Sequence, residues 1–142
     1  MTDVATALSY FWNGFGLPAF VEGTVPDKMP EELHVRNVDG TPVIFERDAP
    51  VKMPYITYRL AKPDWITPVS MYARLWYKST SFRYINAKVD EIEAEIDAGA
   101  VISLDKGTIW LYKESPFSQF MENDDPDVKC IYLNLSMQAV TE

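Results

Sequence analysis

The sequence predicts an α+β domain with a mainly antiparallel β-sheet and two α-helices packed on one face. Two segments, 4–15 and 82–96, carry apolar residues at helical spacing. The strand-like segments are mostly joined by links short enough for hairpins, which favours antiparallel pairing. At 142 residues the chain fits one domain, 1–142, large enough to bury roughly two thirds of its unfolded surface.

The first helix is expected near the beginning of the sequence. Either Thr2 or Asp3 can serve as its N-cap, and Gly14, Gly16 and Pro18 follow to end it. Its apolar residues lie at positions i, i+4, i+7, i+8 and i+11 of one stripe: Val4, Leu8, Phe11, Trp12 and Phe15.

The segment after this helix is interrupted by four prolines between residues 21 and 53. It holds one expected hairpin, 34–38 with 43–47, around the turn pair Asp39-Gly40. We interpret 26–52 as a hairpin extension that lies outside the main sheet.

Two strands are expected next, at 55–60 and 69–78. The second strand alternates apolar residues with a face that is aromatic and cationic, comprising Tyr72, Arg74, Trp76 and Lys78. Interleaved aromatic and basic residues can stack single-stranded nucleic acid. Burial under the extension or a neighbouring subunit is the alternative, and the acidity of the chain favours it.

The second helix is expected to be capped by Ser79, Thr80 or Ser81 and to end at Gly99. Its acidic residues mostly occupy the solvent side. Its apolar residues recur at spacings of three and four: Phe82, Ile85, Val89, Ile92 and Ile96.

Three strands complete the predicted sheet. A hairpin joins 101–104 to 108–113 through a three-residue turn, Asp105-Lys106-Gly107, and the last strand is 130–138. The segment 115–127 is expected to be a connection. Its large apolar residues, Phe117, Phe120 and Met121, either tuck into the domain or contact a partner, with Lys113 and the following acids as a charged rim.

Composition excludes several functional classes. The net charge of −8 argues against broad binding to nucleic-acid phosphates, which needs clustered lysine and arginine. A single cysteine, Cys130, cannot form an internal disulfide and is expected to be buried. We expect no signal peptide and no membrane span, because no basic n-region precedes an apolar run and no segment approaches roughly 20 apolar residues.

Catalytic patterns are also missing from the sequence. The one histidine, His34, has no cysteine beside it, and the glycines form neither GxGxxG nor a P-loop. We therefore expect no enzyme, no catalytic residues and no cofactor. Four acids at 122–127 could bind a hard cation, but their spacing is not that of an EF-hand and Pro126 favours a turn. A weak Mg²⁺ or Ca²⁺ site at a subunit junction is the alternative.

Four segments in order carry a family resemblance: YFWNGFGLPAF, MPYITYRL, WYKSTSF and GTIWLYKESPFSQFMENDDPDVKCIYLNL. Together they resemble the tail terminator, or tail completion, proteins of long-tailed phages and prophages of Gram-positive bacteria. The ending SPF…M…DD…K.IYLNL carries most of the likeness. Between residues 25 and 53 the chain departs from the family pattern, because the hairpin segment stands where a short link is expected.

The resemblance implies a tail-terminator fold and a structural role in the virion at the tail–neck junction, after assembly in the host cytoplasm. It implies a homo-oligomeric ring of six that caps the tail tube protein, stops polymerisation and offers its other face to head-completion or neck proteins. DNA would pass through the lumen without specific binding. A head–tail adaptor or head-closure neck protein is the alternative, and a small ligand-binding domain or enzyme is a third.

A ring requires two different patches on each subunit. The sequence suggests an acidic loop, Asp124 and Asp125, that meets a cationic strand end formed by Arg74, Lys78 and Arg83. The full set of candidate interface residues is Arg74, Trp76, Lys78, Arg83, Lys113, Phe117, Phe120, Met121, Asp124 and Asp125.

Overall fold

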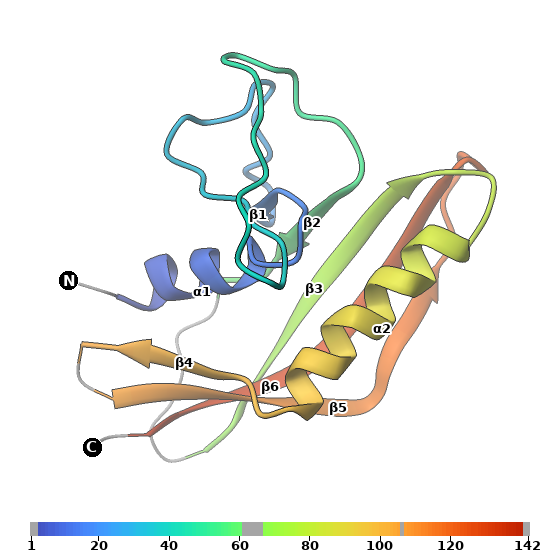
Figure 1. Ribbon diagram of the computed structural model, residues 1–142. Coiled ribbons are helices and arrows are strands. Elements are labelled where there is room, and N and C mark those ends of the chain that lie inside the picture. Colours follow the sequence, from blue (N-terminus) through green and yellow to red (C-terminus); the bar gives the residue numbers. More distant parts are fainter. Residues whose placement is uncertain (1–2, 61–66, 106, 141–142) are drawn as a thin grey trace.

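A computed structural model of the chain describes residues 3–60, 67–105 and 107–140. It contains two helices and one six-stranded sheet with the strand order β1-β2-β3-β6-β5-β4 (Figure 1). The elements are α1 (Val4–Trp12), β1 (Ala19–Val21), β2 (Tyr55–Tyr58), β3 (Val69–Lys78), α2 (Arg83–Asp97), β4 (Val101–Leu104), β5 (Gly107–Met121) and β6 (Val128–Val140).

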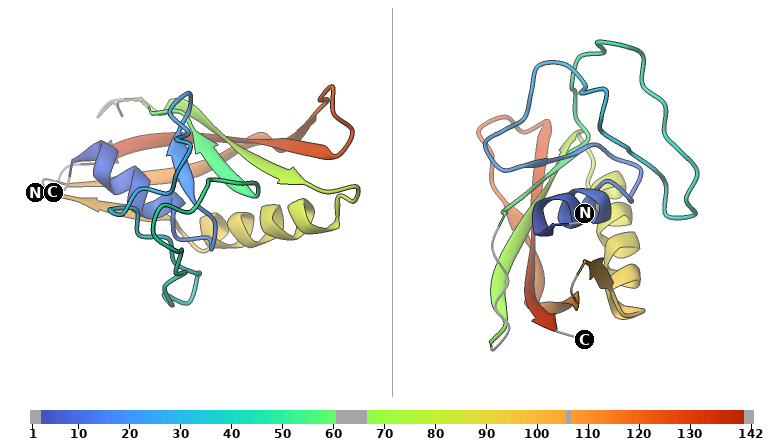
Figure 2. Two further views of the ribbon diagram at one scale, coloured as in Figure 1. Left: turned by 90° about the horizontal axis from the view of Figure 1, so that it is seen from above. Right: turned by 90° about the vertical axis from the view of Figure 1, so that its left-hand side faces the viewer.

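The sheet is antiparallel apart from one pair at its edge. β1 runs parallel to β2, and every other neighbouring pair is antiparallel. Both helices lie on the same side of the sheet (Figure 2). The predicted α+β class with two helices on one face is therefore confirmed.

The core lies between this face and the helices. Alternate residues of the two central strands are buried there, for example Leu75 on β3 and Leu133 on β6. They pack against the buried residues of α2, which are Ile85, Val89, Ile92 and Ile96. All four were predicted to be buried, and Phe82, which was also predicted, is not among them. Each such fully buried side chain contributes about 1.5–3 kcal/mol through removal of apolar surface from water.

Capping and a buried asparagine set the ends of α1. The Asp3 carboxylate accepts a hydrogen bond from the Thr6 N–H at 2.8 Å, and this bond lowers the pKa of Asp3. Thr2, the other predicted N-cap, lies outside the described residues. After Trp12 the buried Asn13 side chain accepts from the Ala19 N–H at 2.8 Å and donates to the Ser9 carbonyl at 2.8 Å. Asn13 therefore ties the end of α1 to β1.

The start of α2 differs from the prediction. Phe82, not a serine or threonine, occupies the N-cap position, and its side chain is exposed rather than part of the buried stripe. Ser81, one of the predicted caps, still satisfies a backbone group at the start of the helix, because its hydroxyl accepts a hydrogen bond from the Arg83 N–H at 3.1 Å. The end agrees with the prediction, since Gly99 follows the helix with φ +99°.

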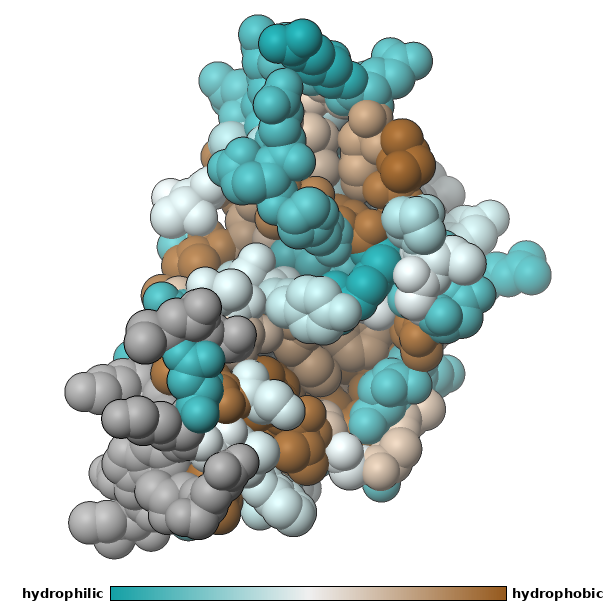
Figure 3. Space-filling model, turned by 60° about the vertical axis from the view of Figure 1, so that its left-hand side comes forward, coloured by the Kyte–Doolittle hydropathy of each residue, from teal (hydrophilic) through white to brown (hydrophobic). Residues whose placement is uncertain are grey.

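The extension is irregular, and its predicted strands at 34–38 and 43–47 were wrong. A turn does form at Asp39-Gly40, where the Asn37 N–H donates to the Thr41 carbonyl at 2.8 Å. Pairing around it is limited to an isolated bridge between Arg36 and Pro42. The bridge is flanked by one further bond, from the Val43 N–H to the Val35 carbonyl at 2.9 Å. The extension lies beyond the sheet and its surface is mostly hydrophilic (Figure 3).

The predicted connection at 115–127 was also wrong. β5 continues to Met121 and pairs with β6, so that Phe120 lies opposite Ile131. A register shift between Lys113 and Ser118 accommodates Pro116, since a bulge on a strand with an open edge tolerates a residue without an N–H. The true connection is 122–127, and β6 begins two residues before the predicted strand.

Smaller differences concern other boundaries. β2 ends at Tyr58 rather than at residue 60, and the three-residue β1 was not predicted. β5 begins at Gly107, whose register partner is Leu104. Lys106, part of the predicted turn, lies outside the described residues.

Candidate functional site

The β5–β6 hairpin ends at one extremity of the sheet, far from α1 (Figures 1 and 2). The end of β3 and the start of α2 lie with it. Lys78 is the register partner of Val128, and the Ser79 N–H donates to the Asp127 carbonyl at 2.6 Å. We call residues 78–83 and 120–129 the hairpin tip.

Exposed apolar side chains form the centre of the hairpin tip. Phe120 is 53% exposed and meets Phe82 edge to face, with ring centroids 4.9 Å apart. The Lys129 ammonium lies 4.9 Å from the centre of the Phe82 ring. Met121 is exposed as well. The tip therefore presents an apolar patch with a cation against it.

The acids of the tip form the predicted turn. The Asp125 carboxylate accepts from the Asp127 N–H at 2.9 Å, and the Asn123 side chain accepts from the Asp125 N–H at 3.4 Å. The Lys129 ammonium donates to the Pro126 carbonyl. Within the described ranges, no group of three His, Cys, Asp or Glu side chains is arranged to hold a metal ion.

Six of the candidate interface residues lie at this tip, and sequence reasoning assigned the four charged ones to two different patches. Lys78, Arg83, Asp124 and Asp125 are all exposed here. A contact between the acids and these cations on two copies would join like ends, which gives a two-fold pair rather than a head-to-tail ring. The suggested pairing therefore does not supply two separate patches.

Arg74 lies elsewhere, on the open face of the sheet, and is engaged within the chain. Its guanidinium forms an ion pair with Glu22, which directly follows β1. The rings of Trp76 and Tyr132 lie 5.5 and 5.0 Å from its guanidinium carbon. Trp76 in turn donates to the Thr57 hydroxyl at 2.9 Å. These polar and aromatic residues on the open face therefore contact one another within the chain.

Sequence reasoning missed three of these contacting residues, which are Glu22, Thr57 and Tyr132. Tyr132 could have been found, because it alternates with the buried residues of β6 and shares the register of Arg74. No sequence pattern pointed to Glu22, because the strand before it has only three residues and is too short to show an alternation.

Lys113 and Phe117 also make contacts within the chain. The Lys113 ammonium donates to Asp97 at 2.8 Å and to Glu93 at 3.1 Å, and these bonds raise the pKa of Lys113. Phe117 is half-buried and packs against the core. Of the two alternatives for the apolar residues of this segment, Phe117 tucks into the domain, whereas Phe120 and Met121 remain exposed.

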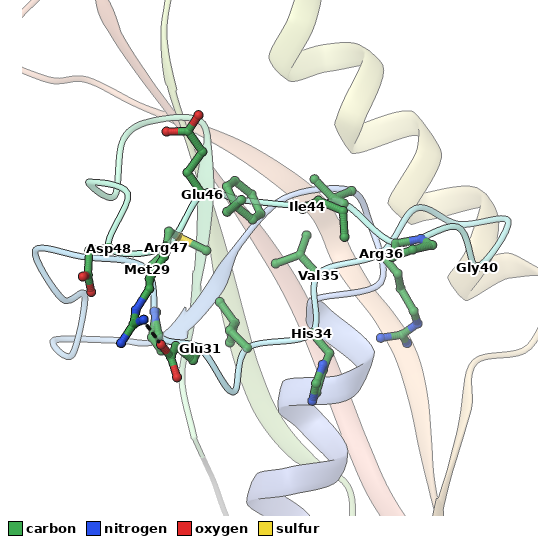
Figure 4. Close-up of a pocket in the computed structure, with 15 residues that line it drawn as sticks. Met29, Glu31, His34, Val35, Arg36, Gly40, Ile44, Glu46, Arg47 and Asp48 are labelled. Carbon is green, nitrogen blue, oxygen red and sulfur yellow. Dashed lines mark ion pairs between the residues drawn. The ribbon is translucent and has the colours of Figure 1, made fainter.

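His34 lines a cavity of about 500 Å³ in the extension (Figure 4). Its side chain, Glu46 and Asp48 point in different directions, so their polar groups do not meet. Arg47 and Glu31 form an exposed ion pair at 3.4 Å. The labelled side chains therefore do not form a cluster of acid and base groups.

The sequence matches no protein-family model, no curated protein and no solved structure. Among the described helices, none is long and apolar enough to cross a membrane.

Proposed function

We propose that this protein is a structural phage tail terminator, which forms a ring of six at the end of the tail tube. The ring stops tube polymerisation and provides the attachment surface for the head or neck, within the virion. Two things support the proposal: the four ordered segments that resemble this family, and the exposed hairpin tip.

The hairpin tip is the observation that carries the proposal. Phe120 and Met121 lie at the end of a strand, exposed, where an isolated domain gains nothing from large apolar side chains. Charged residues of the hairpin tip, including Arg83 and Asp124, are exposed as well. An aromatic centre with a charged rim is the usual composition of a protein–protein contact.

In the proposed role the protein acts by binding to other subunits and does not catalyse a reaction. A terminator covers the last turn of the tube with a surface to which no further tube subunit can add. The net charge of −8 suits a ring through which DNA passes, because like charges repel and keep the DNA from binding.

A head–tail adaptor or head-closure protein remains the alternative, and ring symmetry separates it from a terminator. A terminator matches the sixfold tail, whereas adaptors near the portal are typically twelvefold. The third class, a small ligand-binding domain or enzyme, would require His34 to meet acids in a deep pocket, and these groups diverge (Figure 4).

Electron microscopy of the purified protein tests the proposal. We expect class averages of rings with sixfold symmetry. Twelvefold rings would assign the protein to the neck instead. Particles of single-domain size in every preparation would contradict ring assembly by the isolated chain.

A further inference from the structure

We propose that the acidic turn at 122–127 of one copy binds a hollow at the opposite end of the next copy, between α1, β4 and Arg36. This inference rests on the proposed ring and names the contact that builds it. The hollow measures about 510 Å³ and is lined by Tyr10, Phe11, Arg36, Val101 and Ile102, among others.

Arg36 is held firmly in this hollow. Its N–H donates to the Asn13 carbonyl at 2.9 Å, and its own carbonyl accepts from the Gly16 N–H at 2.8 Å. The guanidinium carbon lies 3.4 Å from the centre of the Tyr10 ring. A Cβ at Gly14 would come within 2.9 Å of Arg36 Nη2, so this glycine makes room for the guanidinium.

The charge of Arg36 is not compensated within the described part of the chain. The ion pairs found there involve other cations, and the buried Nη1 atom of Arg36 has no hydrogen-bond partner. A partly buried guanidinium without a counter-charge attracts a carboxylate, for which its planar fork is well suited.

The apolar surroundings of the two ends also match. Tyr10 is 62% exposed and Val101 is 46% exposed beside the hollow. On this side of the molecule apolar residues are gathered below the hydrophilic extension (Figure 3). The acidic turn is flanked by the exposed Phe120 and Met121. The hollow therefore combines apolar side chains with the Arg36 cation, and the turn combines apolar side chains with carboxylates.

The two ends are placed as a ring requires. α1 and β4 lie together at one extremity of the molecule, and the hairpin tip lies at the other (Figures 1 and 2). A contact between different patches is heterologous, and such contacts close into rings when the rotation between copies allows it. A second copy of this chain is thus the occupant that the charges and the geometry favour.

Charge reversal tests the inference on the full chain, with ring assembly followed by native mass. We expect Arg36→Glu, or the double variant Asp124→Lys, Asp125→Lys, to weaken the contact between copies by roughly 30-fold or more. Combining the reversals in one chain restores assembly. Arg59→Glu is the matched control, because it reverses an exposed positive charge outside both the hollow and the hairpin tip, and we expect it to leave the ring intact.

Circular dichroism and urea midpoints check that each variant folds. Arg36→Gln serves where Arg36→Glu does not fold, since it removes the charge without reversing it. Rings that survive both reversals would overturn this contact and leave the proposed terminator role standing. Dissociation by Arg59→Glu alone would also overturn it, because the loss of the ring would then not depend on the hollow or the hairpin tip. A wild-type chain that forms no ring would contradict the proposed function itself.

Discussion

The Phe120 ring on β5 meets the Phe82 ring at the start of α2 edge to face, with centroids 4.9 Å apart. Phe82 is 39% exposed and Phe120 is 53% exposed. The pair therefore stays on the surface and forms the centre of the hairpin tip, where the proposed contacts with other copies are made.

Replacing Phe120 should weaken assembly while leaving the stability of the fold nearly unchanged. We expect Phe120→Ser to change the free energy of unfolding by no more than about 1 kcal/mol, because the side chain is mostly exposed. Assembly should weaken by roughly 30-fold, as for a central aromatic residue of an interface. Urea denaturation and native mass measure the two effects.

Two other aromatic residues of β5 serve as controls. Tyr112→Ser changes an exposed residue away from the tip and should leave assembly intact. Phe117→Ala should cost about 2 kcal/mol of stability, because this ring packs against the core. Equal effects of Phe120→Ser and Tyr112→Ser on assembly would refute a specific role for the tip.

Asn13 holds α1 to β1, and its replacement should destabilise the fold. The Asn13→Ala variant leaves the buried Ala19 N–H and the Ser9 carbonyl without this partner. We expect a loss of about 2–3 kcal/mol, measured by urea denaturation. The exposed Asn86 gives a matched control, and Asn86→Ala should change stability by less than about 0.5 kcal/mol. Similar values for the two variants would contradict this account.

The Glu22–Arg74 ion pair connects the residue after β1 to β3 across β2. Both side chains are largely buried, with 26% and 21% exposed. We expect Glu22→Gln and Arg74→Met each to cost about 1–2 kcal/mol, because each leaves the other charge unpaired. The double variant should cost less than the two single variants together, by about 1 kcal/mol. Strict additivity in a double-mutant cycle would show that the pair contributes nothing.

Stability should fall with pH above the ordinary thiol range, because burial raises the pKa of Cys130 from 9.0 to about 11. Above pH 9 the unfolded chain loses the thiol proton while the folded chain keeps it, so unfolding becomes more favourable. This contribution is fully present below pH 9 and is lost as the pH rises through about 11.

Cys130→Ala isolates this effect. Burial also raises the pKa of Tyr77 from 10.0 to about 12, so pH 9–10 is the window in which the thiol acts before that tyrosine. We expect the decline in unfolding free energy over this window to be smaller in the variant. Parallel pH profiles for the two proteins would rule out the thiol as the cause.

Periodicity was sufficient to predict the helices and the long strands. Leu75 and Ile92 belong to patterns that fit only one secondary structure, and both are buried as that structure requires. Pro116 misled the prediction of β5, because a proline usually ends a strand and only the bulge shows how this one is accommodated. β1 is too short to give a period at all.

The candidate site was predictable in part. Phe120 and Met121 could be recognised as large apolar residues near a charged segment, and both are exposed. Phe82 was assigned to the buried stripe, because its spacing to Ile85 fits a helix that in fact begins one residue later. The arrangement of Arg36 on Tyr10 could not be predicted, since it joins an irregular segment to a helix through tertiary contacts alone.

The native mass of the wild-type protein, at tens of micromolar and with or without Mg²⁺, tests ring assembly most directly. Our account predicts a species of about 97 kDa, six times the 16.2 kDa of one chain. The hexamer should form without Mg²⁺, because the proposed contact joins protein charges of opposite sign. A mass of 16.2 kDa under every condition would contradict the account.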